Sequence, residues 1–131
     1  MVEEITLFET GEAKNKADKA RLVAQLGQNL VKEQKMPVKQ AGDFAAHELQ
    51  HALKDKGGGK FTAGYLLNKE TGRFKHVAAY TPLGPRTIRE MIEILKAPRV
   101  MSDDDIEAVG LLETQEAPWY KKIIDKIFGK R

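Results

Sequence analysis

Two short apolar stretches on either side of a turn constrain the fold more than any other feature of the chain. Residues 61–67 and 74–80 are rich in aromatic, aliphatic and small apolar residues. The segment between them contains Gly72, and glycine readily adopts the left-handed conformation that a hairpin turn needs. We therefore predict an antiparallel β-hairpin over about residues 60–81.

The pairing register of this hairpin follows from its turn. If Leu67 lies opposite Phe74, then Tyr65 lies opposite His76, and Ala63–Ala78 and Phe61–Tyr80 are the next pairs on the same side. That face is aromatic and apolar with a single histidine in it, and such a face has to be buried. Residues 3–8 contain β-branched and aromatic residues, so they are a candidate third strand.

Helical patterns surround the hairpin. Apolar and small residues recur at steps of three and four, which predicts amphipathic helices. Proline and glycine mark where these helices begin and end. The expected helices span residues 13–35, 38–56, 85–96, 102–112 and 118–131, with breaks at Met36-Pro37, Gly57-Gly58-Gly59 and Ala97-Pro98. The predicted fold class is α+β, with a small antiparallel sheet packed by four or five helices in one domain over residues 1–131.

Composition excludes several classes of protein. The chain has 131 residues, no cysteine and a net charge of +3, so disulfide bonds and thiolate metal sites are both excluded. No apolar run approaches the length that spans a membrane, and the first residues lack the pattern of a signal peptide. We therefore expect a cytoplasmic protein without a transmembrane segment.

The residues best suited to chemistry lie in the second expected helix. His47, Glu48 and His51 form a His-Glu-x-x-His pattern, which puts both imidazoles on one helix face with the carboxylate beside them. The apolar side of the helix is expected to comprise Val38, Ala41, Ala45, Leu49, Ala52 and Leu53. The two histidines then point away from that side, toward solvent or a cleft.

This pattern and its flanking alanines and leucines resemble the signature of zincin metallopeptidases. The resemblance covers about ten residues around the motif, from Phe44 to Leu53. It implies that His47 and His51 bind a zinc cofactor and that Glu48 acts as the general base. The expected activity is hydrolysis of a peptide or protein substrate.

The resemblance also implies a third ligand from a later part of the chain. The expected helix over residues 85–96 offers Glu90, which we take as the first candidate, and Glu93 as the second. His76 of the hairpin is a further alternative by residue type. The edge strand that zincins place before the motif has only residues 3–8 as a counterpart.

Other interpretations of the chain stay open. The two histidines are also compatible with a metal site that has no proteolytic activity, or with an ordinary exposed helix face. A different class of function is a non-enzymatic interaction module for nucleic acid or a protein partner. Its contacts would come from the basic hairpin or from the cationic C-terminal helix with Lys121, Lys122 and Lys126.

Overall fold

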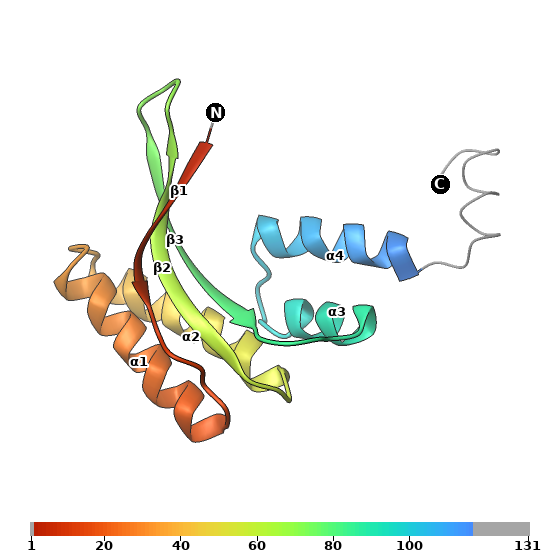
Figure 1. Ribbon diagram of the computed structural model, residues 1–131. Coiled ribbons are helices and arrows are strands. Elements are labelled where there is room, and N and C mark those ends of the chain that lie inside the picture. The colour runs from red at the N-terminus through yellow and green to blue at the C-terminus, as the bar shows by residue number, and fades with distance from the viewer. Residues whose placement is uncertain (1, 117–131) are drawn as a thin grey trace. The chain divides into compact units, whose positions relative to one another are not determined.

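The computed structural model describes residues 2–116, and the chain divides into two compact units, residues 1–85 and 86–131. The first unit contains β1 (Val2–Glu9), α1 (Lys16–Lys32), α2 (Val38–Lys54), β2 (Gly59–Asn68) and β3 (Phe74–Pro82), and the second contains α3 (Ile88–Lys96) and α4 (Asp103–Glu116) (Figure 1). The fold class is α+β, as predicted. The organisation as one domain over residues 1–131 stays a prediction, and the helix expected over 118–131 lies outside the described residues.

The hairpin and its register agree with the prediction from the sequence. β2 and β3 pair antiparallel, with Leu67 opposite Phe74 and Tyr65 opposite His76. Gly72 in the turn has φ 71°, the left-handed conformation expected for it. β1 pairs antiparallel with β2, so residues 3–8 do belong to the third strand and the strand order is β1-β2-β3.

A β-bulge in β1 changes which side chains face the core. Thr6 pairs with Gly64 and Phe8 pairs with Ala63, so Leu7 is an extra residue between them. The extra residue rotates the strand, and Phe8 packs against the core while Leu7 stays 49% exposed. A strict alternation along β1 would have placed Leu7 inward instead.

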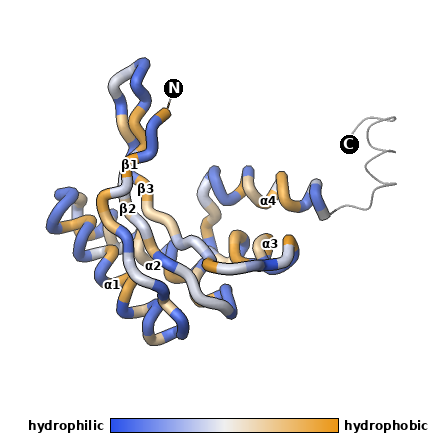
Figure 2. The backbone as a smooth tube through the Cα atoms, in the orientation of Figure 1, coloured by the Kyte–Doolittle hydropathy of each residue, from blue (hydrophilic) through white to orange (hydrophobic). Residues whose placement is uncertain are grey.

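Both helices of the first unit pack on the sheet. α1 contacts β2, α2 contacts β3, and the two helices run side by side (Figure 1). Phe61, Leu26 and Leu30 are the largest fully buried side chains, and burial of each contributes about 1.5–3 kcal/mol. Hydrophobic segments of the strands and helices therefore line this interface, while hydrophilic residues dominate the hairpin turn (Figure 2).

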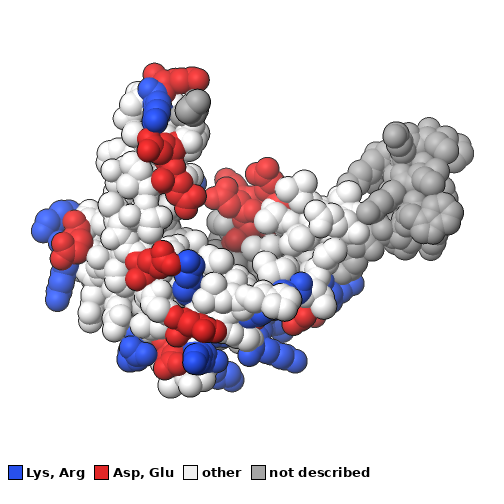
Figure 3. Space-filling model, viewed as in Figure 1, with Lys and Arg blue, Asp and Glu red and all other residues white. Residues whose placement is uncertain are grey.

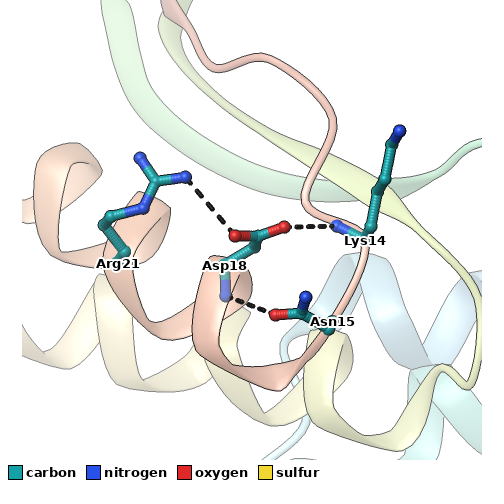
Figure 4. Close-up of polar contacts among 4 residues, drawn as sticks. All are labelled: Lys14, Asn15, Asp18 and Arg21. Carbon is teal, nitrogen blue, oxygen red and sulfur yellow. Dashed lines mark hydrogen bonds and ion pairs between the residues drawn. The ribbon is translucent and has the colours of Figure 1, made fainter.

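α1 is shorter than the predicted helix over residues 13–35. Ala13 forms a β-bridge with Gly59, and the helix begins only after Asn15, whose side-chain Oδ1 accepts a hydrogen bond from Asp18 N at 2.9 Å (Figure 4). Asp18 in turn accepts from Lys14 N and lies 3.5 Å from the Arg21 guanidinium. The N-cap thus defines the start of the helix, because an Asn side chain satisfies an otherwise unpaired amide of the first turn.

Replacing Asn15 with Ala is expected to lower the free energy of unfolding by about 1 kcal/mol, because the Asp18 amide loses its acceptor. Urea denaturation followed by circular dichroism measures the change. Gln25→Ala, at an exposed site within the same helix, serves as the control and is expected to be neutral or slightly stabilising. Equal stabilities of the two variants would contradict the capping role.

The second unit pairs α3 with α4. α3 begins at Ile88 rather than at Pro85, because Thr87 and Glu90 form a capping box that defines its first turn. Ser102 and Asp105 cap the start of α4, since the backbone amide of each donates a hydrogen bond to the side chain of the other. No helix among residues 2–116 has the length and apolarity needed to cross a membrane.

Candidate functional site

The buried stripe of α2 differs from the one that the apolar pattern predicted. Val38 and Leu53 were expected to face the core but are 74% and 44% exposed. Glu48 and His51 are buried together with Ala41 and Ala52. Hydrophobic periodicity treats every polar side chain as outward-facing, whereas a polar group that has a hydrogen-bond partner can be buried at little cost.

The two histidines of the motif lie with their rings close together. Their Nε2 atoms are 3.2 Å apart, the ring centroids are 4.8 Å apart, and the rings meet edge to face at 81°. His51 is buried and His47 half-buried. Spacing of four along the helix brings the rings to the same face, as the sequence predicted. The two nitrogens are within hydrogen-bonding distance of each other, with the donor set by which of the two carries the proton.

Glu48 is directed toward the sheet. Its Oε2 accepts a hydrogen bond at 2.6 Å from the backbone N–H of Tyr80 in β3. The side chain is 7% exposed, so this charged group lies inside the first unit. One oxygen of the carboxylate thereby joins α2 to β3, and this contact holds the helix turn that carries both histidines against the strand.

A second group of buried contacts lies at the carboxyl end of α2. The Tyr80 hydroxyl donates to Asp55 Oδ2 at 2.6 Å. The Lys19 ammonium donates to the carbonyl oxygens of Ala52, Asp55 and Gly57 at 2.7 to 2.8 Å, and it lies 5.6 Å from the centre of the Tyr80 ring. Lys19 therefore caps the carboxyl end of α2, where a cation is favoured.

The Tyr80 ring occupies space that Gly59 leaves open. A Cβ atom at Gly59 would lie 2.3 Å from ring atoms of Tyr80. Gly59, predicted only as part of a helix stop, is thus also the residue that lets Tyr80 reach Asp55. The tyrosine connects β3 to Glu48 through its amide and to Asp55 through its hydroxyl.

The three candidates for a third ligand have different surroundings. Glu90 uses Oε1 to accept a hydrogen bond from Thr87 N at 3.0 Å, as part of the capping box. Glu93 is exposed on α3. His76 Nδ1 lies 3.2 Å from Gln34 Oε1, and its ring meets Tyr65 and Phe74 edge to face. This is the packed histidine that the hairpin register predicted, with Gln34 as its hydrogen-bond partner.

The basic residues proposed for a partner divide into two groups. In the hairpin, Lys60 forms an ion pair with Glu9, and Lys69 forms one with Glu3 at 3.0 Å, so β1 offsets part of the positive charge. Lys121, Lys122 and Lys126 lie outside the described residues.

Sequence reasoning did not single out Lys19, Asp55 or Tyr80. A lysine in the first turn of an amphipathic helix is normally exposed, and an Asp before a glycine run normally belongs to a loop. Only one signal was present: Tyr80 falls on the same face as Phe61 in the predicted register. No family model, curated protein or solved structure matches this chain.

Proposed function

We propose that this chain binds a divalent transition-metal ion, with zinc as the expected metal, through His47 and His51. The separation of 3.2 Å between the two Nε2 atoms supports this most directly. Zinc–nitrogen bonds of about 2.0–2.1 Å at a tetrahedral angle separate two ligand nitrogens by roughly 3.3 Å. The observed separation therefore matches the spacing of two nitrogens that share one zinc ion.

The chemistry of the donors supports the same assignment. Imidazole suits zinc, copper and nickel, whereas magnesium and calcium prefer oxygen ligands. The chain has no cysteine to compete for the ion. When bound, zinc supplies Lewis-acid chemistry to a ligand or substrate. Glu48 helps to position the two histidines, because its hydrogen bond from Tyr80 N holds the helix turn between them against β3.

Hydrolysis of a peptide substrate is the further part of the proposal and rests on the zincin resemblance alone. In that resemblance Glu48 is the general base. One carboxylate oxygen accepts from Tyr80 N, and a carboxylate has a second oxygen with its own lone pairs. Binding and hydrolysis need separate tests.

Metal analysis tests the binding. The full chain, purified without a histidine tag and without chelator, is expected to contain about one zinc ion per chain. His47→Ala and His51→Ala are each expected to lose the metal, because a single imidazole does not chelate. Inductively coupled plasma mass spectrometry gives the content, and visible absorption of the cobalt-loaded protein reports the ligand geometry.

His76→Ala is the matched control, since it removes the third histidine of the chain from a ring cluster on the hairpin. It is expected to keep the metal, and the same assay applied to Glu90→Gln and Glu93→Gln tests whether either carboxylate is the third ligand. Wild-type protein that contains no zinc and takes up none on addition would refute the proposal.

Glu48→Gln separates binding from hydrolysis. The glutamine carbonyl still accepts from Tyr80 N, so this variant is expected to keep the fold and the metal. Loss of peptide cleavage with retained zinc supports a base at this position. A zinc-loaded wild type that cleaves no peptide in a mixed substrate library overturns the hydrolytic part and leaves the binding part intact.

A further inference from the structure

An apolar groove runs between α1 and α2 and is separate from the histidine pair. Its volume is about 410 Å³, and its lining is almost entirely apolar. Val23 and Val31 line it from α1, and Leu49 lines it from α2. Val38, also in the lining, is 74% exposed. Open apolar grooves of this kind accept the apolar face of a partner element.

Small residues create the groove. A Cβ atom at Gly27 would lie 3.6 Å from Ala45 Cβ, so the two helices come close together at this point. Ala24, Gly42 and Ala46 are exposed lining residues that carry a methyl group at most, and nothing lies within 4 Å of a Cβ placed at Gly42. These small residues leave the space between α1 and α2 open.

The helices around the groove carry mainly positive charge. Lys32 belongs to the lining itself. Between residues 14 and 56 the exposed acids are Glu33 and Asp43, and Asp43 is paired with Lys39 at 3.1 Å. The exposed bases in that range are Lys14, Lys16, Arg21, Lys32, Lys35, Lys39, Lys54 and Lys56. In Figure 3, blue side chains lie at the left and lower edges of the first unit, with some red ones among them, and red side chains also lie along β1.

The positive charge around the groove favours some binding partners over others. A second copy docked through the same face would bring two positively charged layers together, which is unfavourable. The chain's own residues 117–131 contain five basic residues against Asp125 alone, so they carry the same sign. A partner with acidic residues beside its apolar face is complementary in both respects.

We propose that the α1–α2 groove binds an amphipathic helix of a partner protein, with its apolar face in the groove and Asp or Glu residues at the flanks. An open apolar site between two helices suits a helix, which presents residues at i, i+3, i+4 and i+7 to such a groove. Lys32 pairs with a flanking carboxylate. The proposal does not depend on the metal site.

Fluorescence anisotropy with designed peptides tests this. The probe is a labelled helical peptide of about 20 residues with leucine at i, i+3, i+4 and i+7 and glutamate at most other positions. The full chain is expected to bind it with micromolar affinity, and affinity should fall several-fold between low and high salt. A peptide with lysine in place of each glutamate is expected to bind at least about 10-fold more weakly.

Two variants locate the interaction. Gly42→Leu fills the groove from an exposed position with open space around it, so the fold is expected to persist. Lys32→Glu reverses the charge of the lining. Each is expected to weaken binding of the acidic peptide about 10-fold. Gly110→Leu in α4 and Lys75→Glu in β3 are the matched controls at exposed sites, and both are expected to bind like the wild type.

Three results would overturn the proposal. The first is equal affinity for the acidic and the lysine-substituted peptide, which would show that charge does not select the occupant. The second is unchanged affinity in Gly42→Leu, which would place the peptide elsewhere. The third is a concentration-dependent dimer in analytical ultracentrifugation that Gly42→Leu abolishes, which would make a second copy the occupant.

Discussion

Replacing Lys19 with methionine is expected to lower the free energy of unfolding by about 3 kcal/mol or more. Lys19 is 3% exposed, and its ammonium group donates to the backbone carbonyls of Ala52, Asp55 and Gly57. Methionine keeps a side chain of similar length but donates nothing. Three acceptors at the end of α2 then lose a charged donor in a site where little water replaces it.

The buried carboxylate of Asp55 adds to this effect. It accepts from the Tyr80 hydroxyl and from Gly57 N. Without the nearby positive charge of Lys19, a negative charge remains inside the unit with weaker compensation, and this is unfavourable. The substitution is therefore expected to be more harmful than the loss of one ordinary hydrogen bond.

Lys16→Met is the matched control for Lys19→Met. Lys16 is exposed in the same helix, so the identical substitution should change stability by less than about 0.5 kcal/mol. Urea denaturation followed by far-ultraviolet circular dichroism compares the two. If both variants unfold at the same urea concentration, Lys19 does not stabilise the end of α2.

Replacing Gly64 with alanine is expected to cost about 2–3 kcal/mol and to loosen β1. A Cβ atom at this position would lie 2.0 Å from the carbonyl oxygen of Ile5 and 3.0 Å from its carbonyl carbon. Both are backbone atoms of β1 beside the bulge, so no side-chain rotation relieves the clash. β1 has to move away from β2, and its hydrogen bonds weaken.

Denaturation and hydrogen exchange together measure this outcome. Amide exchange in residues 2–9 is expected to accelerate more than exchange in β3. Gly42→Ala makes the same change where nothing lies within 4 Å, and it is expected to stabilise the chain by up to about 1 kcal/mol through helix propensity. A Gly64→Ala variant that is as stable as the wild type and keeps its β1 amides protected would mean that β1 does not need to lie this close to Gly64.

Local signals in the sequence predicted most of the fold. Gly72 and the two apolar stretches around it determined the hairpin and its complete register, because a turn of given length aligns every later pair. The boundaries were less accurate. α1 begins at Lys16 rather than at residue 13, since Ala13 is used in a bridge to Gly59, a contact that local propensity does not encode.

The candidate site was predicted in part. The spacing of His47 and His51 placed the two imidazoles together, because residues four apart share a helix face whatever the surroundings. The orientation of that face was not predictable from the apolar pattern. It depends on the hydrogen bond between Glu48 and the Tyr80 amide, which are 32 residues apart in the sequence. It also depends on the hydrogen bonds from Lys19 to the end of α2, where the nearest acceptor in the sequence is 33 residues away.

The sequence by itself determined the local geometry: the hairpin register and the placement of His47 and His51 on one helix face. These features depend on neighbours a few residues apart, so local periodicity suffices to predict them. The tertiary structure alone decided that Glu48, Asp55 and Lys19 are buried, and that an apolar groove stays open between α1 and α2. Burial of a charge depends on a distant donor or acceptor, and a groove depends on the shapes of two packed surfaces.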